Sequence, residues 1–128
     1  MLGIVLVAHS PLADTMKQVV EHIVGDLPDL CVVDVKPEDD AEQKRQEIAD
    51  KVIQANEGEG VIVVTDIYGG VPSNLALSLK ADQVRVMSGM NVPMLVKLVR
   101  MRDKGLDEAV KAAQDIGVEF ILNSEKGE

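Results

Sequence analysis

Three short apolar runs, each followed by a segment with the periodicity of a helix, constrain this chain more than any other feature. The runs cover residues 2–8, 30–35 and 61–65 and are apolar at nearly every position. Such strands are typical of a parallel sheet that helices cover on both faces. A weaker fourth run lies at residues 84–87. Because runs and helical segments alternate, we expect an α/β domain with a mostly parallel sheet.

Helical segments are expected between and after these strands, because apolar residues recur there three and four positions apart. The predicted helices cover residues 11–24, 38–55, 73–79, 91–104 and 106–116. For the first helix, Ser10 is the expected N-cap and Pro11 the first helical residue. Gly25 is expected to end that helix.

The C-terminal region completes the predicted domain. We expect Gly117 to stop the last helix and residues 118–122 to form a short final strand. Residues 1–122 are then one domain, and residues 123–128 are a polar tail. A chain of 128 residues leaves no room for a second domain.

A doubly wound sheet of the flavodoxin type, with strand order 2-1-3-4, fits this order of elements. Its winding reverses between the first and third strands, and ligands bind in the crevice at that switch point. His9 ends the first predicted strand, and Asp66 follows the third. We therefore expect these two side chains to face each other at one edge of the sheet.

A histidine beside a carboxylate has a defined chemistry. The carboxylate accepts the N–H of one ring nitrogen and leaves the other free as a base, ligand or nucleophile. Gly69 and Gly70 let backbone N–H groups approach a bound anion, together with the start of the next helix. Each residue also has a purely structural interpretation, as a polar turn residue, a turn cap or turn punctuation. Their convergence at one sheet edge favours a phosphate-sized site.

Composition argues against several classes of function. The chain has 13 basic and 22 acidic residues, a net charge of −9 and no basic cluster, so we expect no nucleic-acid partner. The acidity indicates good solubility or a partner with a basic face. Two histidines and one cysteine at scattered positions form no metal-ligand set, and dinucleotide, Walker and serine-elbow motifs are absent. We therefore expect neither a metal nor a nucleotide cofactor.

The remaining polar and reactive residues have ordinary interpretations. Cys31 lies in an apolar run and is expected in the core, whereas His22 lies off the apolar stripe of the first helix and is expected at the surface. The first apolar run is too short to span a membrane, and no basic region precedes it, so we expect a cytoplasmic protein. Phospho-acceptor receiver domains have an aspartate where Asp66 lies. This sequence lacks their acidic residues after the first strand and their lysine near the fifth.

Three segments together resemble the enzyme IIA component of the mannose type (mannose/fructose/sorbose family) of the bacterial phosphoenolpyruvate-dependent sugar phosphotransferase system (PTS). The segments are Ile4-Val5-Leu6-Val7-Ala8-His9-Ser10, Asp66-Ile67-Tyr68-Gly69-Gly70-Val71-Pro72-Ser73-Asn74 and Ser88-Gly89-Met90-Asn91-Val92-Pro93-Met94-Leu95. The resemblance spans nearly the whole chain. The glycine-proline segment combined with an upstream strand-end histidine is specific, and the related dihydroxyacetone-kinase phosphocarrier shares only the histidine-bearing start.

The resemblance implies a phosphocarrier that acts in sugar uptake. In that family the residue matching His9 takes a phosphoryl group from the carrier protein HPr and passes it to a IIB component, while the residue matching Asp66 orients the ring. The family further implies a homodimer in which the last strand is exchanged between subunits, and the IIC and IID permease components as further partners. No cofactor is implied, since the donor is itself a phosphohistidine. From the residues themselves we add candidates for binding the phosphoryl oxygens, which are Ser10, Gly69, Gly70 and Ser73.

An alternative function is a regulatory binding module whose phosphorylation state controls a partner protein, without sugar transport. The same strand-end crevice would hold an anion or a partner without turnover. Members of the family often continue through a linker into a IIB domain, whereas this sequence ends at Glu128.

Overall fold

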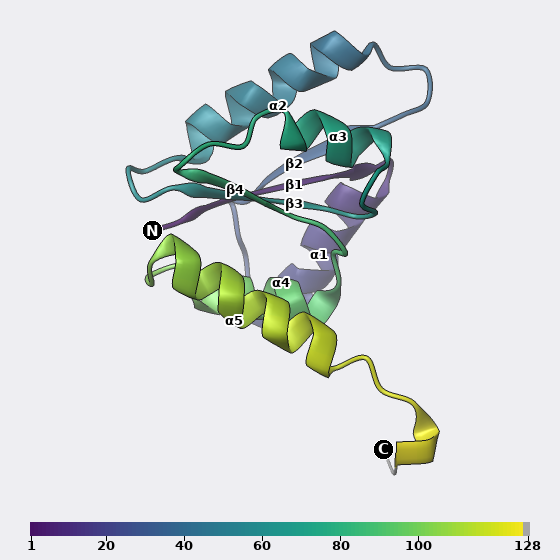
Figure 1. Cartoon of the computed structure of the whole chain (residues 1–128), viewed down its shortest axis with the longest axis vertical. Coiled ribbons are helices and arrows are strands. Elements are labelled where there is room, and N and C mark those ends of the chain that lie inside the picture. The colour runs from purple at the N-terminus through teal and green to yellow at the C-terminus, as the bar shows by residue number, and fades with distance from the viewer. Residues whose placement is uncertain (127–128) are drawn as a thin grey trace.

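The computed structural model, which describes residues 1–126, has a four-stranded sheet at its centre (Figure 1). All three strand pairs are parallel, and the strand order is β2-β1-β3-β4, as predicted. The first strand begins at Gly3, one residue after the start of the predicted apolar run, and His9 is its last residue, as predicted. The strands are β1 (Gly3–His9), β2 (Cys31–Val35), β3 (Val61–Thr65) and β4 (Val84–Met87).

Helices cover both faces of the sheet. Helices α2 (Ala41–Ala55) and α3 (Val71–Leu77) lie over one face, and α1 (Leu12–Val24), α4 (Val92–Arg100) and α5 (Leu106–Glu119) lie over the other (Figure 1). A short 3₁₀ turn, η1 (Ser124–Lys126), follows α5. The doubly wound architecture expected from the alternation of strands and helices is confirmed.

Strand β1 shows why its residues are apolar at consecutive positions. Leu6 and Ala8 are buried with residues of α1, α4 and α5, whereas Val5 and Val7 are buried on the opposite side with α2 and α3. Successive side chains of a strand point to opposite faces, so a central strand covered on both sides needs apolar residues throughout. Burial of each larger side chain contributes about 1.5–3 kcal/mol. Cys31 is buried in the second of these clusters, as predicted.

The start of α1 differs from the prediction, and the neighbouring strand explains why. Pro11 occupies the N-cap position, and Ser10 lies one residue earlier in a turn. Asp34 of β2 provides the cap instead, because its carboxylate accepts hydrogen bonds from the backbone N–H of Ala13 at 2.8 Å and of Asp14 at 3.1 Å. The predicted Ser10 cap is therefore wrong. A carboxylate from the next strand already satisfies the first free N–H groups of the helix and complements its dipole.

The end of α5 also differs from the prediction. The helix continues to Glu119, so Gly117 does not stop it. A side chain at Gly117 would meet the Cβ atom of Met94 on α4 at 3.1 Å. Gly117 therefore permits close packing between α4 and α5, which is a different role from the helix end that was predicted.

The strand predicted at residues 118–122 does not form within the described chain. Residues 120–123 have no regular structure, and the segment pairs with none of the four strands in residues 1–126. Its side chains are largely exposed, by 66% at Val118 and 78% at Ile121. In Figure 1 the chain leaves α5 and runs away from the sheet. An apolar strand-like sequence is thus left without a partner from its own chain.

Candidate active site

His9 and Asp66 meet at the carboxyl edge of the sheet. Strands β1 and β3 are direct neighbours, with Val7 opposite Thr65, so the residues that follow reach the same edge. The ring Nδ1 of His9 lies 2.8 Å from Oδ2 of Asp66. The same oxygen accepts the backbone N–H of His9 at 2.9 Å. The predicted juxtaposition of the two side chains is confirmed.

Hydrogen bonds hold the Asp66 side chain in its ionised form. Partial burial would raise its pKa, but the hydrogen bonds from the backbone and the ring of His9 outweigh that effect. The backbone N–H of Ile67 adds another hydrogen bond, to Oδ1 at 2.8 Å. Together they lower the pKa of Asp66 below its ordinary value. The site therefore contains a carboxylate at neutral pH.

The carboxylate defines which nitrogen of His9 is available for chemistry. Since an ionised carboxylate can only accept hydrogen bonds, the proton of the neutral ring lies on Nδ1. Nε2 then keeps its lone pair. The His9 side chain is 52% exposed, against 13% for Asp66. The arrangement presents an oriented imidazole nitrogen to solvent.

The turn after Asp66 leaves space for the imidazole. A Cβ atom at Gly70 would lie 3.0 Å from Cε1 of His9 and 3.1 Å from Cγ2 of Ile67, closer than side chains normally approach. Gly69 has a φ of +89°, a left-handed backbone conformation that residues with a Cβ atom rarely adopt. Gly69 therefore allows the backbone conformation of the turn, and Gly70 leaves room for the His9 ring.

The two predicted serines lie differently. Ser10 is partly buried beside His9, and its backbone N–H donates to the carbonyl of Val35 at 2.9 Å. Ser73 is fully buried, and its hydroxyl has no hydrogen-bond partner within the described residues. Helix α3 begins at Val71, two residues earlier than predicted, and Ser73 is among its buried residues. Its hydroxyl is therefore not at the opening of the site, and only its backbone N–H remains a candidate for binding a phosphoryl oxygen.

The end of β4 supports the site from behind. Ser88 Oγ lies 3.0 Å from Oγ1 of the buried Thr65, and the backbone N–H of Gly89 donates to the carbonyl of Asp66 at 3.0 Å. These bonds tie the loop after β4 to the residue that holds the His9 ring. The Ser88-Gly89 segment therefore supports the turn that contains Asp66.

A cavity of about 470 Å³ opens beside His9, and the loop after β2 and the first residue of α3 contribute to its wall. The wall is largely apolar, with two charged side chains, and consists of His9, Val35, Lys36, Pro37, Asp39, Ala41 and Val71. Sequence reasoning missed Lys36 and Val71. Since β2 places Val35 directly beside His9 of β1, the strand-end argument that found Asp66 also points to Lys36.

Residues 1–126 contain no candidate metal site. No group of three or more histidine, cysteine, aspartate or glutamate side chains within residues 1–126 is placed to hold a metal ion. No helix in that part of the chain is long and apolar enough to cross a membrane. The two histidines differ in their surroundings. His22 is exposed on α1, whereas His9 has the carboxylate of Asp66 as a partner.

The parallel sheet with order β2-β1-β3-β4 and helices on both faces places the chain among the doubly wound α/β domains, and His9 and Asp66 meet at its switch-point crevice. Residues 3–114 match the family described as "PTS system fructose IIA component". The chain belongs to the mannose-type family of IIA components of the bacterial sugar phosphotransferase system.

Individual relatives agree with this assignment. The PTS system sorbose-specific EIIA component of Lacticaseibacillus casei is 30% identical over an alignment of 132 positions, gaps included, which covers 98% of this chain and 93% of the relative. The PTS system mannose-specific EIIAB component of Escherichia coli K12 is 28% identical over 124 residues, covering 94% of this chain but 38% of that longer protein. The crystal structure of phosphotransferase system component EIIA from Streptococcus agalactiae is similar, with a TM-score of 0.87 and 25% identity. The match covers 98% of this chain and 99% of that one.

Proposed function

We propose that this protein is a phosphocarrier, which accepts a phosphoryl group on His9 from phospho-HPr and passes it to a IIB component in sugar uptake. The observation that supports this most directly is the 2.8 Å contact between Nδ1 of His9 and Asp66. It leaves Nε2 as the exposed nucleophile. The membership of the chain in a IIA family supports the same role.

The proposed transfer conserves protons as well as atoms. The lone pair of His9 Nε2 attacks phosphorus, and a new N–P bond forms as the N–P bond of the donor phosphohistidine breaks. The donor ring, which carries a proton on its other nitrogen, takes back the electron pair of that bond and leaves as a neutral imidazole. His9 keeps its Nδ1 proton throughout, so its ring becomes a phosphorylated imidazolium. The carboxylate of Asp66 stabilises that positive charge, and no metal or nucleotide is required.

Backbone groups near the ring are the proposed ligands for the phosphoryl oxygens. The turn at Gly69 and Gly70 lies against the imidazole, and Ser10 follows His9 directly. We assign this role to the N–H groups of Gly69 and Ser73 and to the Ser10 hydroxyl, and also to the N–H of Gly70, which in this structure donates to the carbonyl of Ile67 at 3.3 Å. Preorganised donors of this kind stabilise charge that develops during transfer.

A labelling experiment tests the phosphocarrier role. The full chain is incubated with phosphoenolpyruvate, enzyme I and HPr, and the adduct is examined for stability in acid and in base. We expect an acid-labile, base-stable phosphoryl group on the wild-type chain and none on His9→Ala. His22→Ala is the matched control, because it removes the other, exposed histidine and should be labelled like wild type. Continued labelling of His9→Ala would disprove the assignment.

The proposal extends to the assembly in which the carrier works. We propose a cytoplasmic homodimer that also contacts the IIC and IID permease components, with residues 1–122 as the functional domain and residues 123–128 as a tail. In the dimer, residues 118–122 of one subunit would pair with the partner's sheet, which requires the last two residues of α5 to leave the helix. The exposed apolar side chains of this segment and the position of β4 at the sheet edge support this arrangement.

Light scattering during size-exclusion chromatography tests the dimer. The wild-type chain should elute with twice the mass of one chain, and Ile121→Asp should shift the equilibrium toward the monomer. A wild-type mass equal to that of a single chain would contradict the proposed dimer, while leaving the phosphocarrier role in place.

A further inference from the structure

Among residues 1–126, Lys36 is the one side chain of permanent positive charge on the wall of the cavity beside His9. It is exposed, and its ammonium group makes no hydrogen bond or ion pair with any side chain described in residues 1–125. The nearby Lys44 is different, since it pairs with Glu47 at 3.1 Å and with Asp39 at 3.7 Å. An uncommitted cation therefore borders the space into which the His9 ring opens.

A phosphoryl group on His9 needs such a cation. It would add a charge of about −1.5 to −2 at neutral pH. Asp66 already lies 2.8 Å from the ring, Asp39 lines the cavity, and the whole chain has a net charge of −9. Val71 presents an apolar side chain to the same cavity, and the hydroxyl of Ser73 is enclosed in the core. Apart from the His9 ring itself, Lys36 is the one side chain of the cavity wall, as residues 1–126 describe it, that can offset the added charge.

The register of the sheet puts Lys36 within reach. Val35 lies directly opposite His9 in the parallel pairing of β1 and β2, and Lys36 is the next residue along the chain. Its backbone N–H donates to the carboxylate of Asp39 at 2.8 Å, which fixes the start of the loop. The long, flexible stem of a lysine leaves its ammonium free to follow a ligand.

We propose that Lys36 binds the phosphoryl oxygens of phosphorylated His9 and so raises the share of the protein that is phosphorylated at a given level of donor. The inference rests on the proposed function, in which His9 is the phosphoryl acceptor. Lys36 forms no covalent bond and keeps its proton, acting as a charged hydrogen-bond donor.

Stabilisation of the phosphorylated form differs measurably from help with docking. A lysine that only steers the donor changes the forward and reverse rates by the same factor, so the equilibrium constant stays unchanged. A lysine that stabilises phosphorylated His9 shifts the equilibrium of phosphoryl exchange. From the strength of exposed ion pairs, we expect that loss of Lys36 lowers the equilibrium constant roughly two- to fivefold.

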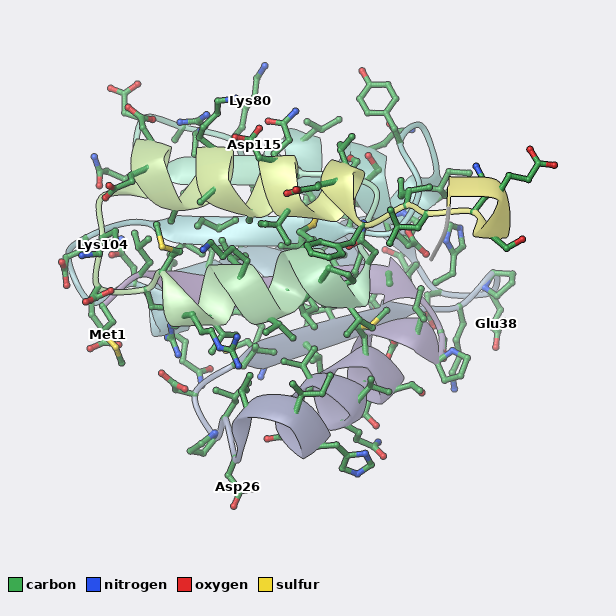
Figure 2. All side chains as sticks on the ribbon, turned by 90° about the horizontal axis from the view of Figure 1, so that it is seen from below. Met1, Asp26, Glu38, Lys80, Lys104 and Asp115 are labelled. Atoms are coloured by element: carbon green, nitrogen blue, oxygen red, sulfur yellow. The ribbon has the colours of Figure 1, made fainter. Side chains whose placement is uncertain are left out.

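The test is the equilibrium constant for phosphoryl exchange between phospho-HPr and the full chain, without enzyme I or phosphoenolpyruvate. The phosphorylated fraction of each protein is measured for wild type, Lys36→Met, Lys36→Arg and Lys104→Met. Lys36→Met should lower the constant, and Lys36→Arg should restore it. Lys104→Met makes the same change in net charge at the end of the molecule opposite Glu38 of the Lys36 loop (Figure 2), and should match wild type. In 0.5 M salt the difference between wild type and Lys36→Met should shrink, because screening weakens an exposed pair.

Two results would overturn the assignment of Lys36. One is an equilibrium constant for Lys36→Met equal to that of wild type. The other is an equal decrease in Lys36→Met and Lys104→Met, which would attribute the effect to net charge alone. Failure of the proposed function gives a different result, because the wild-type chain would then take up no phosphoryl group at all.

Discussion

Two aspartates hold opposite edges of the sheet, and the two contacts distribute burial in opposite ways. At the carboxyl edge, the carboxylate of Asp66 is 13% exposed and its partner His9 is 52% exposed. At the amino edge, beside Leu2, the partner Arg102 is 6% exposed and the carboxylate of Asp29 is 47% exposed. In the first contact the carboxylate is enclosed and the nitrogen base faces solvent. In the second contact the cation is enclosed.

The number of committed donors explains the different roles of these contacts. Arg102 donates from Nε to the carbonyl of Leu2 at 2.8 Å and from its two terminal nitrogens to Asp29, at 3.2 and 2.8 Å. Each of its nitrogens is therefore engaged, and its charge is permanent. His9 commits one ring nitrogen to Asp66 and keeps the other free. A carboxylate whose nitrogen partner has all its nitrogens hydrogen-bonded stabilises the fold. A carboxylate whose partner keeps one nitrogen free is a candidate functional site.

The largest expected effect comes from breaking the amino-edge contact with Arg102→Met. The carbonyl of Leu2 would lose a buried partner, so we expect a loss of roughly 2–4 kcal/mol in the free energy of unfolding. Urea denaturation measures it. Asp29→Asn should cost less than Arg102→Met, because the carboxylate is half exposed. Arg102→Met should still accept a phosphoryl group at a temperature where it is folded, because Arg102 lies at the opposite edge from His9. Loss of labelling in the folded variant would show that both edges serve the reaction.

Disrupting the carboxyl-edge contact should lower the rate of phosphoryl transfer and leave the fold intact. Asp66→Asn keeps the shape of the side chain but removes the charge that stabilises the imidazolium. A charged hydrogen bond of about 1.4–2.7 kcal/mol corresponds to a rate loss of roughly 10- to 100-fold. Rapid-quench measurement of transfer from phospho-HPr gives this rate, and circular dichroism should show an intact fold. An unchanged rate would remove the orienting role of Asp66.

The two glycines of the turn sharpen the comparison at the site itself. In Gly70→Ala the added methyl group would lie 3.0 Å from Cε1 of His9, so the ring must shift by a few tenths of an ångström. We expect transfer to slow by roughly three- to tenfold, because catalysis depends on alignment at this scale. Gly69→Ala is the matched control. Its methyl group meets nothing within 4 Å, but its φ of +89° makes the substitution cost about 1 kcal/mol in stability, with little change in rate. Equal rates for the two variants would contradict the role of Gly70.

The smallest expected effect is the response of stability to acid. The hydrogen bond from Arg102 lowers the pKa of Asp29, and the hydrogen bonds to Asp66 outweigh its burial and lower the pKa of that carboxyl. As pH falls below the ordinary value of 3.8, the unfolded chain therefore binds protons that the folded chain does not. Stability is full above that pH and falls as pH drops through the two lowered pKa values. Urea midpoints at pH 6, 4 and 3 should fall less steeply in Asp29→Asn than in wild type, and parallel curves would contradict this contribution.

The sequence predicted best those features that depend on local pattern. Residues 61–65 are apolar at each of the first four positions, and they form a buried strand over the whole predicted range. The contact of His9 with Asp66 followed from strand order alone. Both predictions use periodicity and topology, and neither needs the exact position of a side chain.

The errors arose where a distant segment decides the local structure. Ser10 does not cap α1, because Asp34 of β2 reaches the same N–H groups. Gly117 does not end α5, and its lack of a side chain instead lets Met94 of α4 pack closely against the helix. Secondary-structure propensity depends on the residues of one segment, whereas these contacts come from residues elsewhere in the chain.

The double use of one carboxylate oxygen has a consequence for spectroscopy. Oδ2 of Asp66 accepts both the backbone N–H of His9 at 2.9 Å and its ring nitrogen at 2.8 Å. Hydrogen–deuterium exchange at this amide therefore requires the carboxylate to release the His9 backbone. The exchange rate of one backbone proton reports how often that grip opens. It provides a measure of site order that needs no substrate and no label on the imidazole.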